Sequence, residues 1–170
     1  VHAKADLQSV TTIPGIAGLA ATSIIAVGLG PITASQTAGQ QHEALRLAAG
    51  AALRSISKAS SVAIISPSDD AESVAALAQG ALLGAYRFTA FRSEQPTVTI
   101  KTITVITEAA KDRDVVAQTK SAVAIAQRVD LVKDLVNTPP SHLSPVVFAK
   151  TAATEAKKRG ITVQVLDEVQ

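Results

Sequence analysis

Short apolar runs rich in β-branched residues alternate with longer stretches of helical periodicity along this chain. This alternation is the feature that most constrains the fold. Strands that alternate with helices in this way are typical of layered α/β folds with a largely parallel sheet and flanking helices. We expect strands over residues 23–29, 61–66, 98–107 and 162–167, and helices over 37–58, 68–91, 113–137 and 144–160.

Residues that cap or stop helices lie at the ends of these expected helices. Thr37 can cap the first helix, and Ser68-Asp69-Asp70 supplies a cap and acidic groups for the second. Ser144-Pro145 starts the last helix, and Gly160 is a candidate left-handed cap at its end. Asn137-Thr138-Pro139-Pro140 stops the third, because proline has no amide donor and restricts the residue before it.

Two glycines, Gly80 and Gly84, lie one turn apart inside the second expected helix. Each costs about 1 kcal/mol relative to alanine in a helix interior. We therefore expect another backbone to approach this face closely.

The segment 144–167 supplies only one helix and one strand. A lone strand has no sheet of its own.

The composition narrows the possible functions. Aromatic residues are only 2% of the 170, so alanine, valine, isoleucine and leucine must fill the core. There is no cysteine, which excludes disulfides and thiolate zinc sites and fits a cytoplasmic protein. A net charge of +2 does not argue for nucleic acid, and the basic run 157–159 is expected at a helix end. The apolar stretch 13–29 is broken by Pro14 and glycines, which favours a loop and a buried strand over a membrane span.

The candidate ligand-binding side chains do not form a convincing site. His2, His42 and His142 share no metal-ligand spacing, so each is interpreted as solvated or structural. Asp130 and Asp134 share a helix face, but Lys133 and the lack of a third nearby ligand favour a solvated face.

One cofactor-binding motif is incomplete in this chain, and one catalytic motif is absent. Gly28-Leu29-Gly30 follows a strand like a dinucleotide-binding loop, but Thr33 stands at the third glycine position, and Pro31 occupies the turn. No Gly-x-Ser-x-Gly motif occurs. We therefore predict no catalytic, cofactor-binding or metal-binding residue in this chain.

Four segments together resemble the leucyl aminopeptidase family. Residues 79–88 resemble its Gly-x-x-x-Gly helix that runs into Tyr-Arg-Phe. Residues 133–140 resemble the segment that joins its two domains, where Arg is commoner than Lys133. An earlier strand and helix of the family resemble Val27 to Gly30 followed by Arg46 and Ala49-Gly50. The first strand of its catalytic domain resembles residues 160–168. The matches span residues 24–170. Residues 1–21 match poorly, where the family normally has a first strand and helix, so these are either missing or diverged.

The resemblance implies a macro-domain-like N-terminal α/β domain at 1–112, a connecting helix at 113–137 and the truncated beginning of the catalytic domain at 138–170. Family members remove N-terminal residues from peptides, as cytoplasmic hexamers, with two divalent ions (manganese, zinc or magnesium) held in the catalytic domain by a lysine, several carboxylates and an Asn-Thr-Asp-Ala-Glu-Gly-Arg signature. That signature is absent here. We therefore expect an inactive N-terminal portion whose partner is its own catalytic domain.

Two other functions remain open. Macro-like folds can bind ADP-ribose or other nucleotides at the strand ends, although the closely spaced glycines of a phosphate loop are not found. DNA binding is a side role of some family members, and the near-neutral charge disfavours it.

Overall fold

The computed structural model describes residues 2–15, 17–31, 33, 35–94 and 99–166. The chain divides into two compact units, Val1–Asp130 and Leu131–Gln170, and the boundary between them falls inside a long helix. The predicted boundaries after residues 112 and 137 are not tested by this division and stay predictions.

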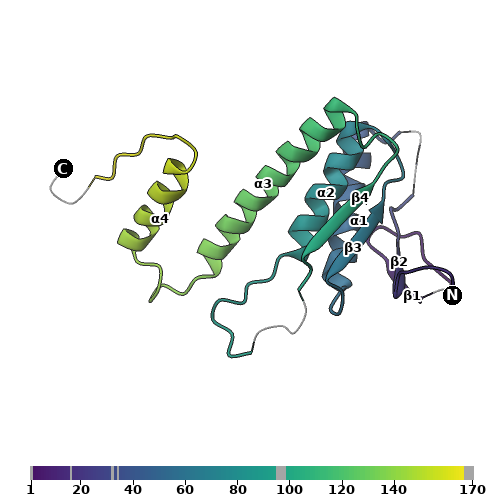
Figure 1. Cartoon of the computed structure of the whole chain (residues 1–170), viewed down its shortest axis with the longest axis horizontal. Helices are drawn as coiled ribbons and strands as arrows, with labels where there is room; N and C mark the ends of the chain where they lie inside the picture. Colours follow the sequence, from purple (N-terminus) through teal and green to yellow (C-terminus); the bar gives the residue numbers. More distant parts are fainter. Residues whose placement is uncertain (1, 16, 32, 34, 95–98, 167–170) are drawn as a thin grey trace. The chain divides into compact units, whose positions relative to one another are not determined.

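The first unit holds two short sheets (Figure 1). Strand β1 (Val10–Pro14) pairs antiparallel with β2 (Ser23–Val27). Strand β3 (Ser61–Ile65) pairs parallel with β4 (Thr102–Ile106). The predicted α/β class, with a parallel sheet and flanking helices, is therefore confirmed.

The pairing of β1 with β2 was not predicted. The stretch that begins at Ile13 was expected to be a loop before a buried strand, and that expectation is wrong for residues 13–14. The register joins Val10 to Val27 and Pro14 to Ser23. Pro14 ends its strand, a place where a missing amide donor disturbs the ladder little.

Helices α1 (Ala38–Ser55) and α2 (Ala71–Ala85) pack against β3 and β4 (Figure 1). Alternate strand side chains face these helices, as the two-residue period of a strand requires. Buried side chains of the two helices form the centre of the core, and Leu53 is fully buried. These residues are Leu45, Ala49, Leu53, Ala76, Leu77 and Ala81, and the strand residues against them are Val62, Ile64, Ile103 and Val105.

The starts of both helices follow the predicted caps. The Thr37 hydroxyl accepts a hydrogen bond from the Gln40 amide at 3.3 Å, while the Gln40 side chain accepts one from the Thr37 amide at 2.9 Å. The carboxylate of Asp70 accepts a hydrogen bond from the Ser73 amide at 2.8 Å, which caps α2.

The predicted end of α2 at Phe91 is wrong, because α2 ends at Ala85. The guanidinium of Arg87 donates to the carbonyls of Gly84 at 2.9 Å and Tyr86 at 2.8 Å. It also donates to the carbonyls of Leu53 and Arg54 at 3.4 and 3.2 Å, so it joins the C-terminal ends of α1 and α2. One side chain thus satisfies carbonyls that a longer helix would have bonded internally.

The predicted strand 98–107 is shorter in the structure, since β4 begins at Thr102. Val98 lies outside the described residues. Helix α3 (Arg113–Asn137) has the predicted bounds.

The second unit contains the end of α3 and helix α4 (Pro145–Lys157). Ser144 caps α4 and Pro145 opens it, as predicted. Gly160 has a φ of 72°, the left-handed conformation expected there. The predicted strand at 162–167 is wrong for residues 162–166, which form no strand, and residue 167 lies outside the described chain.

Candidate functional site

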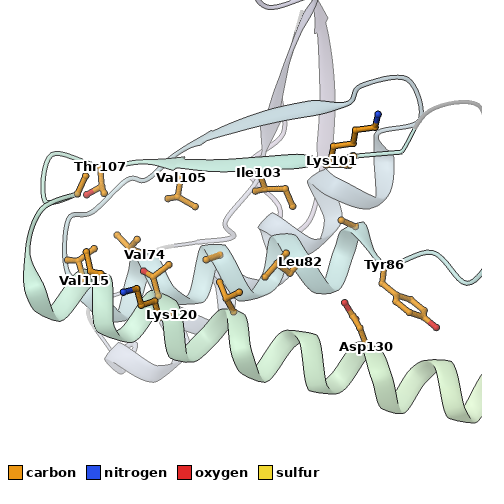
Figure 2. A pocket seen from close by; sticks show the side chains of 17 residues that line it. Val74, Leu82, Tyr86, Lys101, Ile103, Val105, Thr107, Val115, Lys120 and Asp130 are labelled. Atoms are coloured by element: carbon orange, nitrogen blue, oxygen red, sulfur yellow. The ribbon is translucent and has the colours of Figure 1, made fainter. Parts of the chain in front are cut away.

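A groove with a volume of about 600 Å³ lies between α2, β4 and the first part of α3 in the first unit (Figure 2). Its walls are mainly apolar. Helix α2 contributes one stripe of side chains, β4 contributes residues that face the helices, and α3 closes the other side. The apolar lining residues include Val74, Ala78, Leu82, Ile103, Val105, Val115 and Val123.

Polar side chains stand at the two ends of this apolar groove. Thr107 and Lys120 lie at the Val115 end, and Tyr86 and Asp130 lie at the other (Figure 2). The hydroxyl of Thr119 is buried and has no hydrogen-bond partner among the described residues. Neither the groove nor this hydroxyl was anticipated from the sequence, because both depend on how α3 lies beside β4.

A second, smaller hollow of about 270 Å³ is lined by residues of α1, α2 and α3. Its polar side chains already bond to one another. The guanidinium of Arg46 donates to the Gln79 side chain at 2.7 Å and pairs with Glu43, and Gln118 lies 3.5 Å from a carboxylate oxygen of Glu72. These internal partners leave little free hydrogen-bonding capacity for a ligand.

The three histidines do not come together with other ligands. His42 lies beside the second hollow, 3.6 Å from a carboxylate oxygen of Asp70. The Ser68 hydroxyl, which donates at 2.5 Å, is the main cause that lowers the pKa of Asp70 to about 2, and the Ser73 amide and His42 add to it. His2 is exposed, and the imidazole of His142 lies 3.0 Å from the Ser141 hydroxyl. These contacts fit structural or solvated roles.

Asp130 and Asp134 lie one turn apart on α3. Across the described ranges, no three histidine or acidic side chains are grouped so that they could hold a metal ion. The two-metal centre implied by the family resemblance therefore does not fit these residues. The prediction that its ligands lie elsewhere stays a prediction.

The Gly28-Leu29-Gly30 loop is occupied by the chain's own N-terminal segment. The Gly28 amide donates to the Ser9 carbonyl, and the Gly30 amide donates to the Ala5 carbonyl, both at 2.9 Å. A Cβ atom at Gly28 would overlap the carbonyl oxygen of Asp6. Gly28 therefore permits a close approach of backbone to backbone, and both amides that a phosphate would need are already bonded.

The carboxyl ends of β3 and β4 are also tied together. The side chain of Asp69 accepts hydrogen bonds from the Thr107 hydroxyl and from the Glu108 amide, the latter at 2.9 Å. The Thr107 hydroxyl is the main cause, ahead of that amide, that lowers the pKa of Asp69. A carboxylate thus occupies the place where open α/β sheets commonly bind ligands.

The basic run at the end of α4 has the expected structural position. Helix α4 ends at Lys157, and the ammonium of Lys158 pairs with Glu155 at 2.6 Å. Cations here complement the C-terminal end of the helix dipole. Separately, none of the described helices is both long and apolar enough to cross a bilayer.

Solved structures with this arrangement include a bottromycin maturation enzyme and a leucine aminopeptidase. The bottromycin maturation enzyme BotP is 27% identical, with a TM-score of 0.75, over 93% of this chain and 33% of that chain. A mutant of tomato leucine aminopeptidase is 25% identical, with a TM-score of 0.75, over 98% and 33%.

Sequence comparisons lead to the same group of proteins. A "Probable cytosol aminopeptidase" of Streptomyces griseus is 35% identical over 93% of this chain, and one of Streptomyces avermitilis is 37% identical over 94%. The chain spans about a third of the length of these relatives, 33% in each case. Residues 2–95 match the family model described as "Cytosol aminopeptidase family, N-terminal domain". The chain therefore belongs to the cytosol aminopeptidase family and contains its N-terminal domain.

Proposed function

We propose that this chain is the non-catalytic N-terminal portion of a metal-dependent leucyl aminopeptidase that removes N-terminal residues from peptides. The family model that it matches is that of the N-terminal domain, and its relatives are named as aminopeptidases. The parent enzyme is proposed to be a cytoplasmic homo-hexamer.

The metals of the parent enzyme are proposed to lie outside these residues. A similar solved structure is that of BotP in complex with Mn, which supports a divalent ion in this family. Manganese, zinc and magnesium all suit the parent site, since carboxylates bind each of them. The described residues offer no such ligand group, so no catalytic step is assigned to them.

Exposed apolar side chains on the second unit support a docking role for this part of the chain. No residue of α4 is buried, and Val146, Val147 and Phe148 are exposed by 77%, 43% and 50%. The apolar side chains of the segment that follows are also exposed, namely Ile161, Val163, Val165 and Leu166. Soluble proteins rarely leave apolar residues so clustered in sequence uncovered. We infer that they pack on the catalytic domain.

An activity assay tests the catalytic part of this proposal. The purified 170-residue chain is expected to hydrolyse no leucine p-nitroanilide, with or without added manganese. Hydrolysis that a chelator abolishes would show that the chain holds a working metal centre, contrary to the proposal.

A binding assay tests the docking part. The C-terminal two thirds of the Streptomyces griseus relative, produced separately, is the partner, and co-elution with the chain is the measurement. Phe148→Glu is expected to weaken the complex, because a charge in an apolar interface is costly. Phe91→Glu, at a 47% exposed phenylalanine of the first unit, is the matched control and should not matter. Equal effects of the two substitutions would contradict the assignment of the surface.

The alternative of a freestanding nucleotide or ADP-ribose module has less support. The amides of Gly28 and Gly30 are bonded to the N-terminal segment, and the Glu108 amide at the end of β4 is already bonded to Asp69. Calorimetry with ADP-ribose decides between the two functions. Saturable binding would favour the module.

A further inference from the structure

We propose that the groove between α2, β4 and α3 binds a short, extended, apolar peptide whose free carboxylate lies near Lys120. The ligand would lie along the edge of β4. This binding site goes beyond the proposed function and does not depend on it.

The open edge of β4 is the first observation. Within the described residues, β4 pairs with β3 alone, so its other edge has no strand beside it. The groove is lined by Ile103 and Val105 of β4 but by no residue of β3, which places it on the side of β4 away from β3. An extended peptide there can bond to the unpaired backbone groups of β4, a common mode of peptide recognition.

The shape and polarity of the walls are the second observation. Val74, Ala78, Leu82 and Ala85 form one stripe of α2 along the floor. From Val74 to Ala85 this stripe runs about 16 Å, at ~1.5 Å per residue. An extended chain covers that distance in about five residues, at ~3.3 Å each. Alternate side chains of such a peptide would face an apolar floor, which favours valine, isoleucine or leucine at those positions.

The charges at the two ends are the third observation. Lys120 lies at the end where β4 terminates, whereas Asp130, beside Tyr86, and Lys101 both lie towards the opposite end (Figure 2). Lys120 has no ion-pair partner among the described residues, and the buried hydroxyl of neighbouring Thr119 has no hydrogen-bond partner there. A peptide that runs parallel to β4 places its carboxylate near Lys120. Lys120 therefore favours a peptide with a free carboxylate over an uncharged ligand.

The test is calorimetric titration of the 170-residue chain with the peptide Val-Thr-Val-Thr-Val and, separately, with its C-terminal amide. The free acid is expected to bind about fivefold more tightly than the amide, the size of a solvent-exposed ion pair. Chemical shifts of the Ile103 and Val105 signals should change during the titration.

Variants at exposed positions distinguish a specific contact with the peptide carboxylate from non-specific binding. Lys120→Gln should remove the difference between acid and amide. Lys111→Gln, an exposed lysine outside the groove, deletes the same charge and should preserve it. Val116→Asp, at a 36% exposed lining residue, should weaken binding of the acid more than that of the amide.

Several results would overturn the proposal. These are no saturable binding of either peptide, equal affinities of acid and amide for the unmodified chain, or an unchanged difference in Lys120→Gln. Binding of dodecanoate but not of the peptides would assign the groove to a fatty carboxylate instead. Concentration-dependent dimerisation that shifts the Ile103 and Val105 signals would assign it to a second copy of the chain.

Discussion

Two glycines set how closely α1 and α2 approach each other. A Cβ atom on Gly80 would overlap the carbonyl oxygen of Arg46, and one on Gly84 would lie 2.7 Å from the Cα of Gly50. The obstacles are backbone atoms, so no rotamer change can relieve them. The close approach expected from the sequence is therefore confirmed, and its partner is α1.

Substitution of Gly84 should reverse the usual order of helix propensity. Alanine is favoured over glycine by about 1 kcal/mol in an open helix interior, but Gly84→Ala is expected to destabilise the fold by about 3 kcal/mol, because overpacking forces the two backbones apart. Gly84→Leu should unfold or expand the first unit. Urea unfolding followed by circular dichroism measures both.

Gly39→Ala is the matched control in α1. An added Cβ there meets only the Thr37 hydroxyl, at 4.0 Å. This variant should be neutral or stabilising by up to about 1 kcal/mol. A Gly84→Ala protein as stable as the unmodified chain would refute the steric explanation.

The stability of the fold should depend on pH through Asp70, and the sign of this dependence follows from its pKa. Its pKa is lowered from 3.8 to about 2 in the folded chain, first by the Ser68 hydroxyl, so the folded state favours the carboxylate. The resulting stabilisation is fully present above about pH 4 and is lost as the pH falls towards 2.

Asp70→Ala is expected to lower the free energy of unfolding by about 1 kcal/mol at pH 7, the usual cost of losing a helix cap. Because Asp70 is 45% exposed, solvent screening keeps the effect small. The difference from the unmodified chain should shrink below pH 3. Parallel denaturation curves at pH 7 and pH 2.5 measure it, and an equal difference at both values would argue against the linkage.

At the scale of secondary structure, one side chain bonds to the C-terminal ends of two helices. Apolar residues continue at helical spacing to Phe88, so periodicity alone extended α2 towards Phe91. Arg87 instead turns back to the carbonyls of Gly84, Leu53 and Arg54. Arg87 of the Tyr-Arg-Phe motif therefore caps α2 and also α1, whose last residues lie more than thirty positions earlier in the chain.

Arg87→Ala should lower the stability of the first unit by about 2 kcal/mol, because hydrogen bonds from a charged donor to partly buried carbonyls are lost. Arg87→Lys should recover little of this, since a single ammonium cannot reproduce the fork of the guanidinium. Thermal unfolding measures both. Arg92→Ala, at an exposed arginine beyond the helix, is the control and should shift the midpoint little. Full recovery by lysine would show that charge, not geometry, is what matters.

At the scale of the whole molecule, burial is distributed unevenly between the two units. Every residue of the main core lies within the first unit, whereas the second has no buried residue in α4. Free energy of folding should follow the same division, because it depends mainly on apolar area removed from water.

Leu53→Ala should therefore cost about 3 kcal/mol, as expected for a fully buried leucine. Phe148→Ala should cost less than about 0.5 kcal/mol in this chain, because the ring is already half exposed. Chemical denaturation of both variants tests the contrast. A large loss from Phe148→Ala would mean that the second unit has a core of its own.

Local patterns were sufficient for much of this fold. Caps such as Thr37, Asp70 and Ser144 and the full length of α3 depend on neighbours in sequence. The glycine pair Gly80 and Gly84 indicated a close backbone approach but not its partner, which is α1. The remaining features depend on residues far apart in the chain. Pairing of β1 with β2, the stop of α2 at Ala85 and the groove beside β4 all require the elements to be packed first. The segment 162–166 shows the same limit, because a strand pattern forms a strand only where another strand accepts its hydrogen bonds.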